Sequence, residues 1–327
     1  MSTLVIQTAF LGDAVLTLPL INRLAQRFGP VDVVLTPLAA QLLTGQPAIR
    51  RVIPYDKRGA DRGLAGLNRV AAQLRGEAYQ RAFLPHRSLR TAWLARKAGI
   101  PQRTGFAGGP AGWLHTHRIV RPDQGHETER LAALSGDRSA VTSPWFEISS
   151  NDRTNARMWL DAKGIREDFV VFAPGAAWAT KRWPHYPALG ATLDRPIVVI
   201  GGGDDRVTGE AIATSTAGRA RNAAGELSLI QSAAVMAHAA LVVSNDSLAF
   251  HLASALARPV VAIAGPTGPA PGFGPFSAAA QVVAHPTLAC RPCSPHGHSR
   301  CPLGHHRCMR ELTPEGVLDA VRGGLVG

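Results

Sequence analysis

The chain has 327 residues. This is longer than a domain with a single hydrophobic core usually is, and it suits two domains. Hydrophobic residues make up 46% and charged residues 18%, which excludes an intrinsically disordered chain. The 35 Lys and Arg residues exceed the 23 Asp and Glu residues, and the net charge of +12 favours anionic partners such as nucleic acid, anionic lipid or phosphorylated sugars. Because the basic residues are scattered, a solvated Arg-rich surface explains the charge equally well.

The first half of the chain alternates short apolar strands with amphipathic helices. The sequence predicts strands at 4–7, 31–35, 52–53 and 82–84, and helices at 14–28, 39–43, 64–74 and 89–98. The first strand begins almost at once and no basic segment precedes it, so we expect no signal peptide and a cytoplasmic protein. No apolar run reaches about 18 residues, so no transmembrane helix is expected.

The second half repeats the alternation after a polar, turn-rich stretch. A helix at 126–134 precedes that stretch and belongs to the first lobe. After it, helices are predicted at 152–163, 229–238, 247–256 and 313–321, and strands at 169–172, 197–200, 241–244 and 259–264. We therefore expect an α/β protein with two doubly wound parallel-sheet lobes, residues 1–150 and 151–327. The second includes a Cys-rich segment, 286–310, and a closing helix. Ligands of such lobes lie at the carboxyl ends of the strands, hence in the cleft between them.

Three clusters at strand-to-helix junctions carry polar side chains. Asp13 opens the first helix, as a simple helix cap or as a general base aimed into the cleft. Lys181, one of only four lysines, lies in the loop that follows a predicted strand and the Pro174-Gly175 turn, and it could bind a phosphate. The glycines and the lysine of this loop do not have the spacing of a Walker A loop. Asp246 or Ser247 would cap a helix whose free N–H groups suit a diphosphate, with His251 one turn along.

All four cysteines fall in one short stretch, Cys290, Cys293, Cys301 and Cys308. Such a cluster in a cytosolic chain favours a structural zinc ion over disulfides. The spacing matches no common zinc ribbon, so free thiols or redox-sensitive pairs stay open. A catalytic zinc is not expected, because four thiolates leave no open position.

Several further motifs complete an ordered set. They are Leu11-Gly12-Asp13 with Leu16-Thr17-Leu18-Pro19, Pro85-His86-Arg87-Ser88-Leu89-Arg90, Ala98-Gly99-Ile100-Pro101, 175–184, 244–251, Gly265-Pro266-Thr267, and Cys301-Pro302-Leu303-Gly304-His305 with Cys308-Met309-Arg310. The set resembles glycosyltransferase family 9, the ADP-heptose:lipopolysaccharide heptosyltransferases, and especially its heptosyltransferase II branch. The resemblance implies a GT-B fold, two Rossmann-like lobes facing across a cleft, with an acceptor lobe first and a nucleotide-sugar lobe second.

The resemblance also implies roles for individual residues. Asp13 matches the general base, and Lys181 with Thr180 matches the groups that hold the diphosphate. The remaining implied site residues are Asp246, Ser247, Leu248 and His251 for the nucleotide sugar, Asp204 or Asp205 for a ribose, and Gly12, Arg87 and Arg90 for the acceptor. Two departures stand out: Leu248-Ala249-Phe250 replaces a Gly-Pro-Met segment, and Ala177 replaces a common Arg.

The function implied is transfer of a heptose from ADP-heptose, with inversion and without a metal or other cofactor for the chemistry, to a phosphorylated, lipid-linked inner-core oligosaccharide. Such an acceptor predicts peripheral contact with an anionic membrane face. The alternatives are a GT-B transferase with another nucleotide sugar or acceptor, and a non-catalytic nucleotide-sugar-binding protein. A nucleic-acid-binding module is not expected, because aromatic residues are only 6% of the chain and no binding motif is present.

Overall fold

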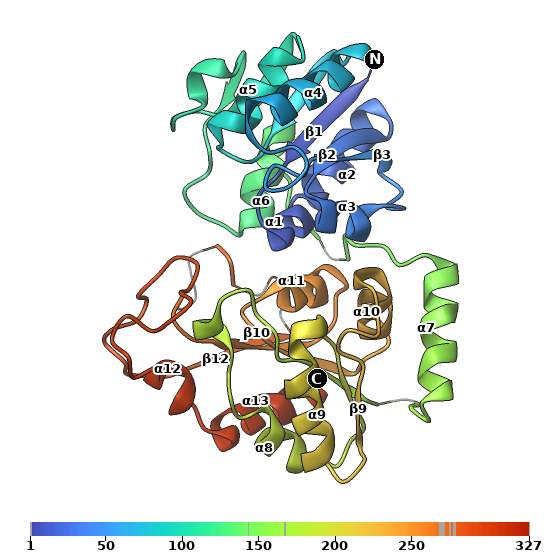
Figure 1. Ribbon diagram of the computed structural model, residues 1–327, viewed down its shortest axis with the longest axis vertical. Helices are drawn as coiled ribbons and strands as arrows, with labels where there is room; N and C mark the ends of the chain where they lie inside the picture. Colours follow the sequence, from blue (N-terminus) through green and yellow to red (C-terminus); the bar gives the residue numbers. More distant parts are fainter. Residues whose placement is uncertain are drawn as a thin grey trace. The chain divides into compact units, whose positions relative to one another are not determined.

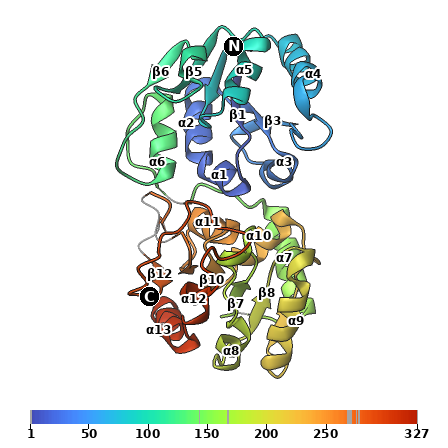
Figure 2. The same cartoon turned by 60° about the vertical axis from the view of Figure 1, so that its left-hand side comes forward.

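The computed structural model describes residues 2–142, 144–166, 168–267, 272–274, 276 and 279–326. The chain forms two compact units, residues 1–147 and 148–327, and each contains one six-stranded parallel sheet (Figures 1 and 2). Within the described residues, no helix is long and apolar enough to cross a lipid bilayer.

Unit 1 is built on a sheet in the order β3-β2-β1-β4-β5-β6. Its strands are β1 (Thr3–Gln7), β2 (Val31–Leu35), β3 (Ile49–Pro54), β4 (Arg81–Leu84), β5 (Gln102–Phe106) and β6 (His117–Ile119). Its helices are α1 (Leu11–Leu16), α2 (Leu18–Phe28), α3 (Pro37–Leu43), α4 (Gly63–Gly76), α5 (Leu89–Lys97) and α6 (Glu127–Ala132), with short 3₁₀ turns η1 (Gly112–Leu114) and η2 (Ala133–Ser135). The central strands β1 and β2 are buried along their whole length, as expected of a sheet covered on both faces.

Unit 2 repeats the same topology with the order β12-β11-β10-β7-β8-β9. Its strands are β7 (Val170–Ala173), β8 (Ile197–Val199), β9 (Ala220–Asn222), β10 (Leu241–Asn245), β11 (Val260–Ala264) and β12 (Ala280–Ala284). Its helices are α7 (Ser150–Ala162), α8 (Tyr186–Ala191), α9 (Arg206–Ser215), α10 (Leu229–Met236), α11 (Leu248–Ala255), α12 (Arg307–Arg310) and α13 (Pro314–Val326), with 3₁₀ turns η3 (Ala179–Lys181) and η4 (Gly203–Asp205). Counted along the chain within each unit, both sheets have the strand order 3-2-1-4-5-6 of a Rossmann fold.

This order fixes where a ligand site is built. In a doubly wound sheet the strand order reverses direction between the first and fourth strands. The loops that follow these two strands therefore lead to opposite faces of the sheet and leave a crevice at their carboxyl ends. In unit 1 that point lies between β1 and β4, and in unit 2 between β7 and β10. The predicted α/β fold with two doubly wound parallel sheets is confirmed.

The predicted helix at 14–28 is wrong in one respect, because the structure divides it at Thr17 into α1 and α2. The Thr17 hydroxyl donates to the Asp13 carbonyl at 2.7 Å and accepts a bond from the Gln7 amide at 2.9 Å. Pro19 follows in the first turn of α2, where its missing N–H does no harm, whereas inside one continuous helix it would remove a bond.

Candidate active site

In unit 1, Asp13 lies at the switch point, in the first turn of α1 just beyond β1. Its carboxylate accepts the backbone N–H of Phe10 at 3.0 Å, so it does serve as a helix cap. Its side chain is half-buried. The neighbouring Gly12 is helical, the second residue of α1. Capping by one carboxylate oxygen is compatible with a general base, because a carboxylate has four acceptor positions.

Cationic side chains line the same edge of unit 1. The Lys57 ammonium donates to the carbonyl of Thr8 at 2.5 Å, at the end of β1. Burial and the charges of Arg58 and Arg90 lower the pKa of Lys57. Burial and then the Lys57 charge lower the pKa of His86, which favours its neutral imidazole. Lys57 thus lies beside the end of β1, on the edge of unit 1 that also carries Asp13, and no role was predicted for it from the sequence.

The two arginines predicted to bind the acceptor differ in their surroundings. Arg90 donates to the Tyr55 hydroxyl at 2.6 Å and to the carbonyls of Asp61 and Gly63, so it joins α5 to the start of α4. Arg87 is exposed, and its guanidinium lies beside Gly109 so closely that a Cβ there would come within 2.9 Å of it. Arg87 is thus presented to solvent, whereas Arg90 is first of all a structural link.

The centre of the unit 2 site is an ion pair at its switch point. Lys181 in η3 follows β7, and Asp246 directly follows β10. The Lys181 ammonium lies 2.8 Å from the Asp246 carboxylate, which also accepts the Thr267 hydroxyl at 2.7 Å. Burial alone would raise the pKa of Asp246, but the charge of Lys181 and these hydrogen bonds lower it below its ordinary value, with a further contribution from His251. Asp246 is therefore an anion that fixes the cation Lys181.

Asn245, the last residue of β10, is a buried polar residue that the sequence reasoning left without a role. Its amide N–H donates to the Pro174 carbonyl at 2.6 Å, and its amide oxygen accepts the Trp183 N–H at 3.3 Å. The Asn245 side chain thus forms hydrogen bonds with both ends of the 174–183 loop, which carries Lys181. A buried polar group on a central strand was the available signal, since such groups need partners.

Thr180 is placed by this structure inside the protein. It is 3% exposed, its hydroxyl donates to the His298 carbonyl at 2.8 Å and accepts the His298 N–H at 2.8 Å. The His306 ring contacts the Thr180 carbonyl at 2.8 Å. Thr180 therefore positions Lys181 against the Cys-rich segment, and the direct diphosphate contact expected of its hydroxyl would require breaking these bonds.

Helix α11 begins at Leu248 with Ser247 as its N-cap residue. The expected side-chain cap is not formed, because the Ser247 hydroxyl contacts the Ser244 hydroxyl at 3.2 Å and caps no helix N–H. The first N–H groups of α11 are thus left without a side-chain cap, at the positive end of the helix dipole. His251 lies in the second turn of this helix.

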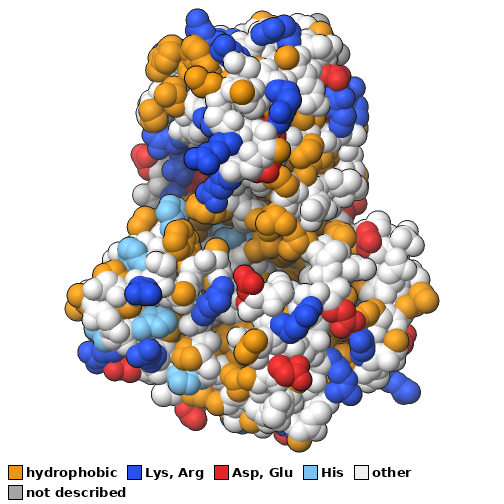
Figure 3. Space-filling view, in the orientation of Figure 1, with side chains coloured by type: hydrophobic (Ala, Val, Ile, Leu, Met, Phe, Trp, Pro, Cys, Tyr) orange, Lys and Arg blue, Asp and Glu red, His pale blue; other side chains and the backbone are white. Residues whose placement is uncertain are grey.

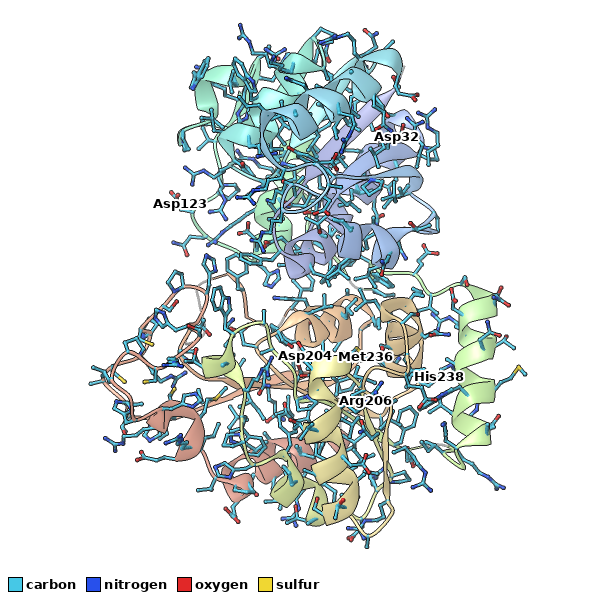
Figure 4. The ribbon with its side chains drawn as sticks, in the orientation of Figure 1. Asp32, Asp123, Asp204, Arg206, Met236 and His238 are labelled. Atoms are coloured by element: carbon cyan, nitrogen blue, oxygen red, sulfur yellow. The ribbon has the colours of Figure 1, made fainter. Side chains whose placement is uncertain are left out.

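The ribose candidates occupy η4, after β8. Asp204 is exposed, and Figure 4 labels it near Arg206 at the start of α9. The Asp205 carboxylate accepts the Gly202 N–H at 2.9 Å, and it lies where a Cβ on Gly175 would be, 2.4 Å away. Only a glycine leaves room for that carboxylate, so Asp205 caps its own turn beyond β8 and packs on Gly175, while Asp204 remains the exposed carboxylate.

The comparisons with known proteins agree with this arrangement. The model of glycosyltransferase family 9 (heptosyltransferase) matches residues 67–304. The chain belongs to glycosyltransferase family 9. Lipopolysaccharide heptosyltransferase 2 of Salmonella typhimurium is 27% identical over 347 residues, 98% of this chain and 97% of the relative, and that of Escherichia coli K12 is also 27% identical, over 98% and 97%.

Solved structures support the fold. The structure of E. coli ADP-heptose lps heptosyltransferase II has a TM-score of 0.78 and 26% identity, and the comparison covers 100% of this chain and 99% of that one. A glycosyl transferase family 9 protein from Veillonella parvula has a TM-score of 0.85 at 22% identity, over 99% and 97% of the two chains. The GT-B class predicted for this family 9 glycosyltransferase is confirmed.

The predicted structural zinc site of this glycosyltransferase is not supported. Cys290, Cys293, Cys301 and Cys308 are free thiols, and in the described part of the chain no three His, Cys, Asp or Glu side chains are grouped to hold a metal ion. Cys308 packs into the unit 2 core, where burial raises its pKa to about 11 and keeps the thiol protonated, while Cys293 is exposed.

Hydrogen bonds to the loops beyond β7 and β11 hold the Cys-rich segment. Arg291 donates to the carbonyls of Ala264 and Gly265, and the Cys293 N–H donates to the Pro266 carbonyl at 2.9 Å. Together with the contacts of His298 and His306 to Thr180, these bonds fasten the Cys-rich segment across the ends of β7 and β11. The segment therefore helps to hold the loops beyond β7 and β11 in place.

Proposed function

We propose that this family 9 glycosyltransferase transfers a heptose from ADP-heptose to a lipopolysaccharide inner-core acceptor or a related glycolipid. Relatives that match over almost their full length are heptosyltransferases 2, and a more distant solved relative, E. coli heptosyltransferase WaaC, binds ADP-2-deoxy-2-fluoro heptose. The observation that carries the proposal is the fixed Lys181–Asp246 pair beside the uncapped start of α11, at the switch point of unit 2.

The donor half-site is suited to the leaving group. As the bond between the anomeric carbon and the diphosphate breaks, negative charge develops on ADP, and donors fixed in advance stabilise that charge. Lys181 and the first N–H groups of α11, at Leu248, supply such donors. Asp246 is itself an anion and would repel phosphate, so its role is to position Lys181 and to accept sugar hydroxyls. Asp204 accepts the ribose hydroxyls.

The acceptor half-site supplies the base. The Asp13 carboxylate takes the proton of the acceptor hydroxyl while the oxygen attacks the anomeric carbon from the face opposite ADP, so the configuration inverts. Arg87 and Lys57 attract acceptor phosphates. No residue in this scheme requires a metal, and the protein works at the inner face of the cytoplasmic membrane, where a lipid-linked acceptor would be found.

The test is incubation with ADP-heptose and inner-core acceptors, followed by mass spectrometry for the addition of one heptose. Competition by ADP-, GDP- and UDP-sugars identifies the base that the donor site accepts. Turnover with another nucleotide sugar in preference to ADP-heptose would support a different GT-B transferase. Tight ADP binding without any turnover, unaffected by Asp13→Asn, would instead support a non-catalytic binding protein.

A further inference from the structure

Gln7, the last residue of β1, is a buried polar side chain at a position where the neighbouring strands have apolar ones. Strands β2 and β4 end in Leu35 and Leu84, and both leucines are buried. The Lys and Arg side chains that Figure 3 shows on the surface of unit 1 are in contact with water, whereas Gln7 is only 3% exposed. A buried amide without partners is destabilising, so the hydrogen bonds of Gln7 indicate its role.

The Gln7 amide forms hydrogen bonds on both sides of the segment that carries Asp13. Its oxygen accepts the Ala9 N–H at 3.2 Å, before α1, and its nitrogen donates to the Thr17 hydroxyl at 2.9 Å, after α1. The partners fix this orientation of the amide, because the Ala9 N–H can only donate and the Thr17 hydroxyl donates its proton to the Asp13 carbonyl at 2.7 Å. We call Gln7 and Thr17, with these three hydrogen bonds, the Gln7 clamp.

Helix α1, which carries Asp13, depends on such anchors. It has six residues, and a helix of this length has little stability of its own. At its start the Phe10 N–H donates to the Asp13 carboxylate at 3.0 Å, and at its end the Thr17 hydroxyl holds the Asp13 carbonyl. The Gln7 clamp fixes Ala9, the residue before Phe10, and also the carbonyl of Asp13. It therefore determines the direction of the Asp13 carboxylate.

Asn245 in unit 2 has a matching arrangement. It is also the last residue of a strand at a switch point, and its amide bonds to both ends of the loop that carries Lys181. Each unit thus has one buried amide, at the end of a switch-point strand, that holds the segment with a proposed functional charge. An amide needed for stability alone has no reason to occupy this position in both units.

We propose that Gln7, acting through Thr17, is a positioning residue for the Asp13 carboxylate in glycosyl transfer. This inference rests on the proposed function, because it takes Asp13 as the base of that reaction. A base must lie within hydrogen-bonding distance of the hydroxyl that it deprotonates, and a displacement of about 1 Å can lower the rate about a hundredfold. Loss of the Gln7 clamp therefore slows the chemical step and leaves the binding of the nucleotide sugar, proposed for unit 2, unchanged.

The first test compares two buried hydroxyl groups near the carboxyl end of β1. Thr17→Val removes the hydroxyl of the Gln7 clamp, and the matched control Thr91→Val removes the hydroxyl that contacts the Thr8 hydroxyl at 3.3 Å. Thr17 and Thr91 are 0% and 1% exposed, so an effect of lost stability alone would appear in both variants.

In heptose-transfer kinetics we expect the kcat of Thr17→Val to fall about tenfold to a hundredfold, while KM for ADP-heptose stays within about twofold of the wild type. Gln7→Leu should show the same loss. Thr17→Ser, which keeps the hydroxyl, and Thr91→Val should keep kcat within about threefold of the wild type.

The second test does not depend on transfer. Hydrogen exchange resolved to single amides reports on the Gln7 clamp, because the Ala9 N–H bonds to Gln7 and the Phe10 N–H bonds to the Asp13 carboxylate. Both amides should exchange about tenfold faster or more in Gln7→Leu than in the wild type, and at the wild-type rate in Thr91→Val.

Equal kcat values in Thr17→Val and Thr91→Val, a raised KM with an unchanged kcat, or unchanged exchange at Phe10 in Gln7→Leu would each overturn the proposal. If the wild type transfers heptose and neither Gln7→Leu nor Thr17→Val lowers kcat, the positioning role fails and the proposed function stands. If the wild type transfers no heptose while exchange at Phe10 depends on Gln7, the proposed function fails and the Gln7 clamp still orients Asp13.

Discussion

The substitution Lys181→Ala tests two proposed roles of this lysine: stabilising the fold by pairing with Asp246, and binding the diphosphate of ADP. The Lys181 and Asp246 side chains are only 13% and 23% exposed, so the substitution leaves a largely buried carboxylate without its cation. Breaking a buried pair in this way costs about 3–5 kcal/mol. Because Asp246 keeps its bond to Thr267, we expect a loss of about 2–3 kcal/mol in the free energy of unfolding at pH 7.5.

The pH dependence of that loss has a definite sign. In the wild type the pKa of Asp246 is lowered, so its ionised form stabilises the fold above the unfolded-state pKa, and this contribution is lost as pH falls. Without Lys181, the two strongest influences that lower the pKa of Asp246 are removed, so we expect burial to raise this pKa relative to the wild type. The deficit of Lys181→Ala should therefore shrink between pH 7.5 and pH 5, as the carboxyl becomes protonated.

Urea unfolding at the two pH values and calorimetric titration with ADP provide the measurements. The control is Lys163→Ala, which breaks an exposed pair with Glu226 and should cost less than about 1 kcal/mol. In Lys181→Ala/Asp246→Asn most of the stability should return, while the ADP dissociation constant stays about thirtyfold higher, the loss of one charge-assisted bond of about 2 kcal/mol. A deficit independent of pH, or wild-type ADP affinity in the double variant, would refute the reasoning.

Three other changes test the remaining parts of the site. Asp13→Asn should abolish heptose transfer, measured by product formation, and lower the stability by only about 1 kcal/mol as a weakened cap; normal turnover would leave Asp13 as a cap alone. Thr180→Val should weaken ADP binding in calorimetry because the link to His298 is lost, whereas Thr180→Ser should keep it; equal affinities of the two variants would exclude the positioning role. A thiol reagent at pH 8 should label exposed Cys293 in the folded protein, slowed by its raised pKa, and buried Cys308 only after unfolding; simultaneous labelling would contradict the burial of Cys308.

The central strands could be predicted from the sequence, because β1, β2, β10 and β11 are apolar runs without competing signals. The edge strands β6 and β9 could not, because they are three residues long, half-exposed and polar, so they lack both alternation and an apolar run. Their pairing with a neighbouring strand, not their own composition, makes them strands.

The candidate site, like the sheets, has one part that could be predicted from the sequence and one part that could not. Asp246 directly follows one predicted strand and Lys181 lies in the loop after another, so their placement at one switch point follows from the parallel sheet. The engagement of Thr180 with His298 could not be predicted, because it depends on how a non-periodic segment 118 residues later crosses the sheet edge. The clustering of the four cysteines in one short stretch suggested a metal, but the burial of Cys308 in the core is a tertiary property that this clustering does not encode.

The Cys-rich segment positions Lys181 through its hydrogen bonds to Thr180, and this has a consequence for biosynthesis. The ribosome makes residue 181 well before His298 and His306, and at about 5–20 residues per second the delay to residue 306 is about 6–25 s. During this interval the nascent chain has the first strands of the second sheet but not the contacts that orient the lysine. The proposed donor site is therefore completed among the last events of translation, and a prematurely terminated product would retain the amino-terminal sheet without the contacts that orient Lys181.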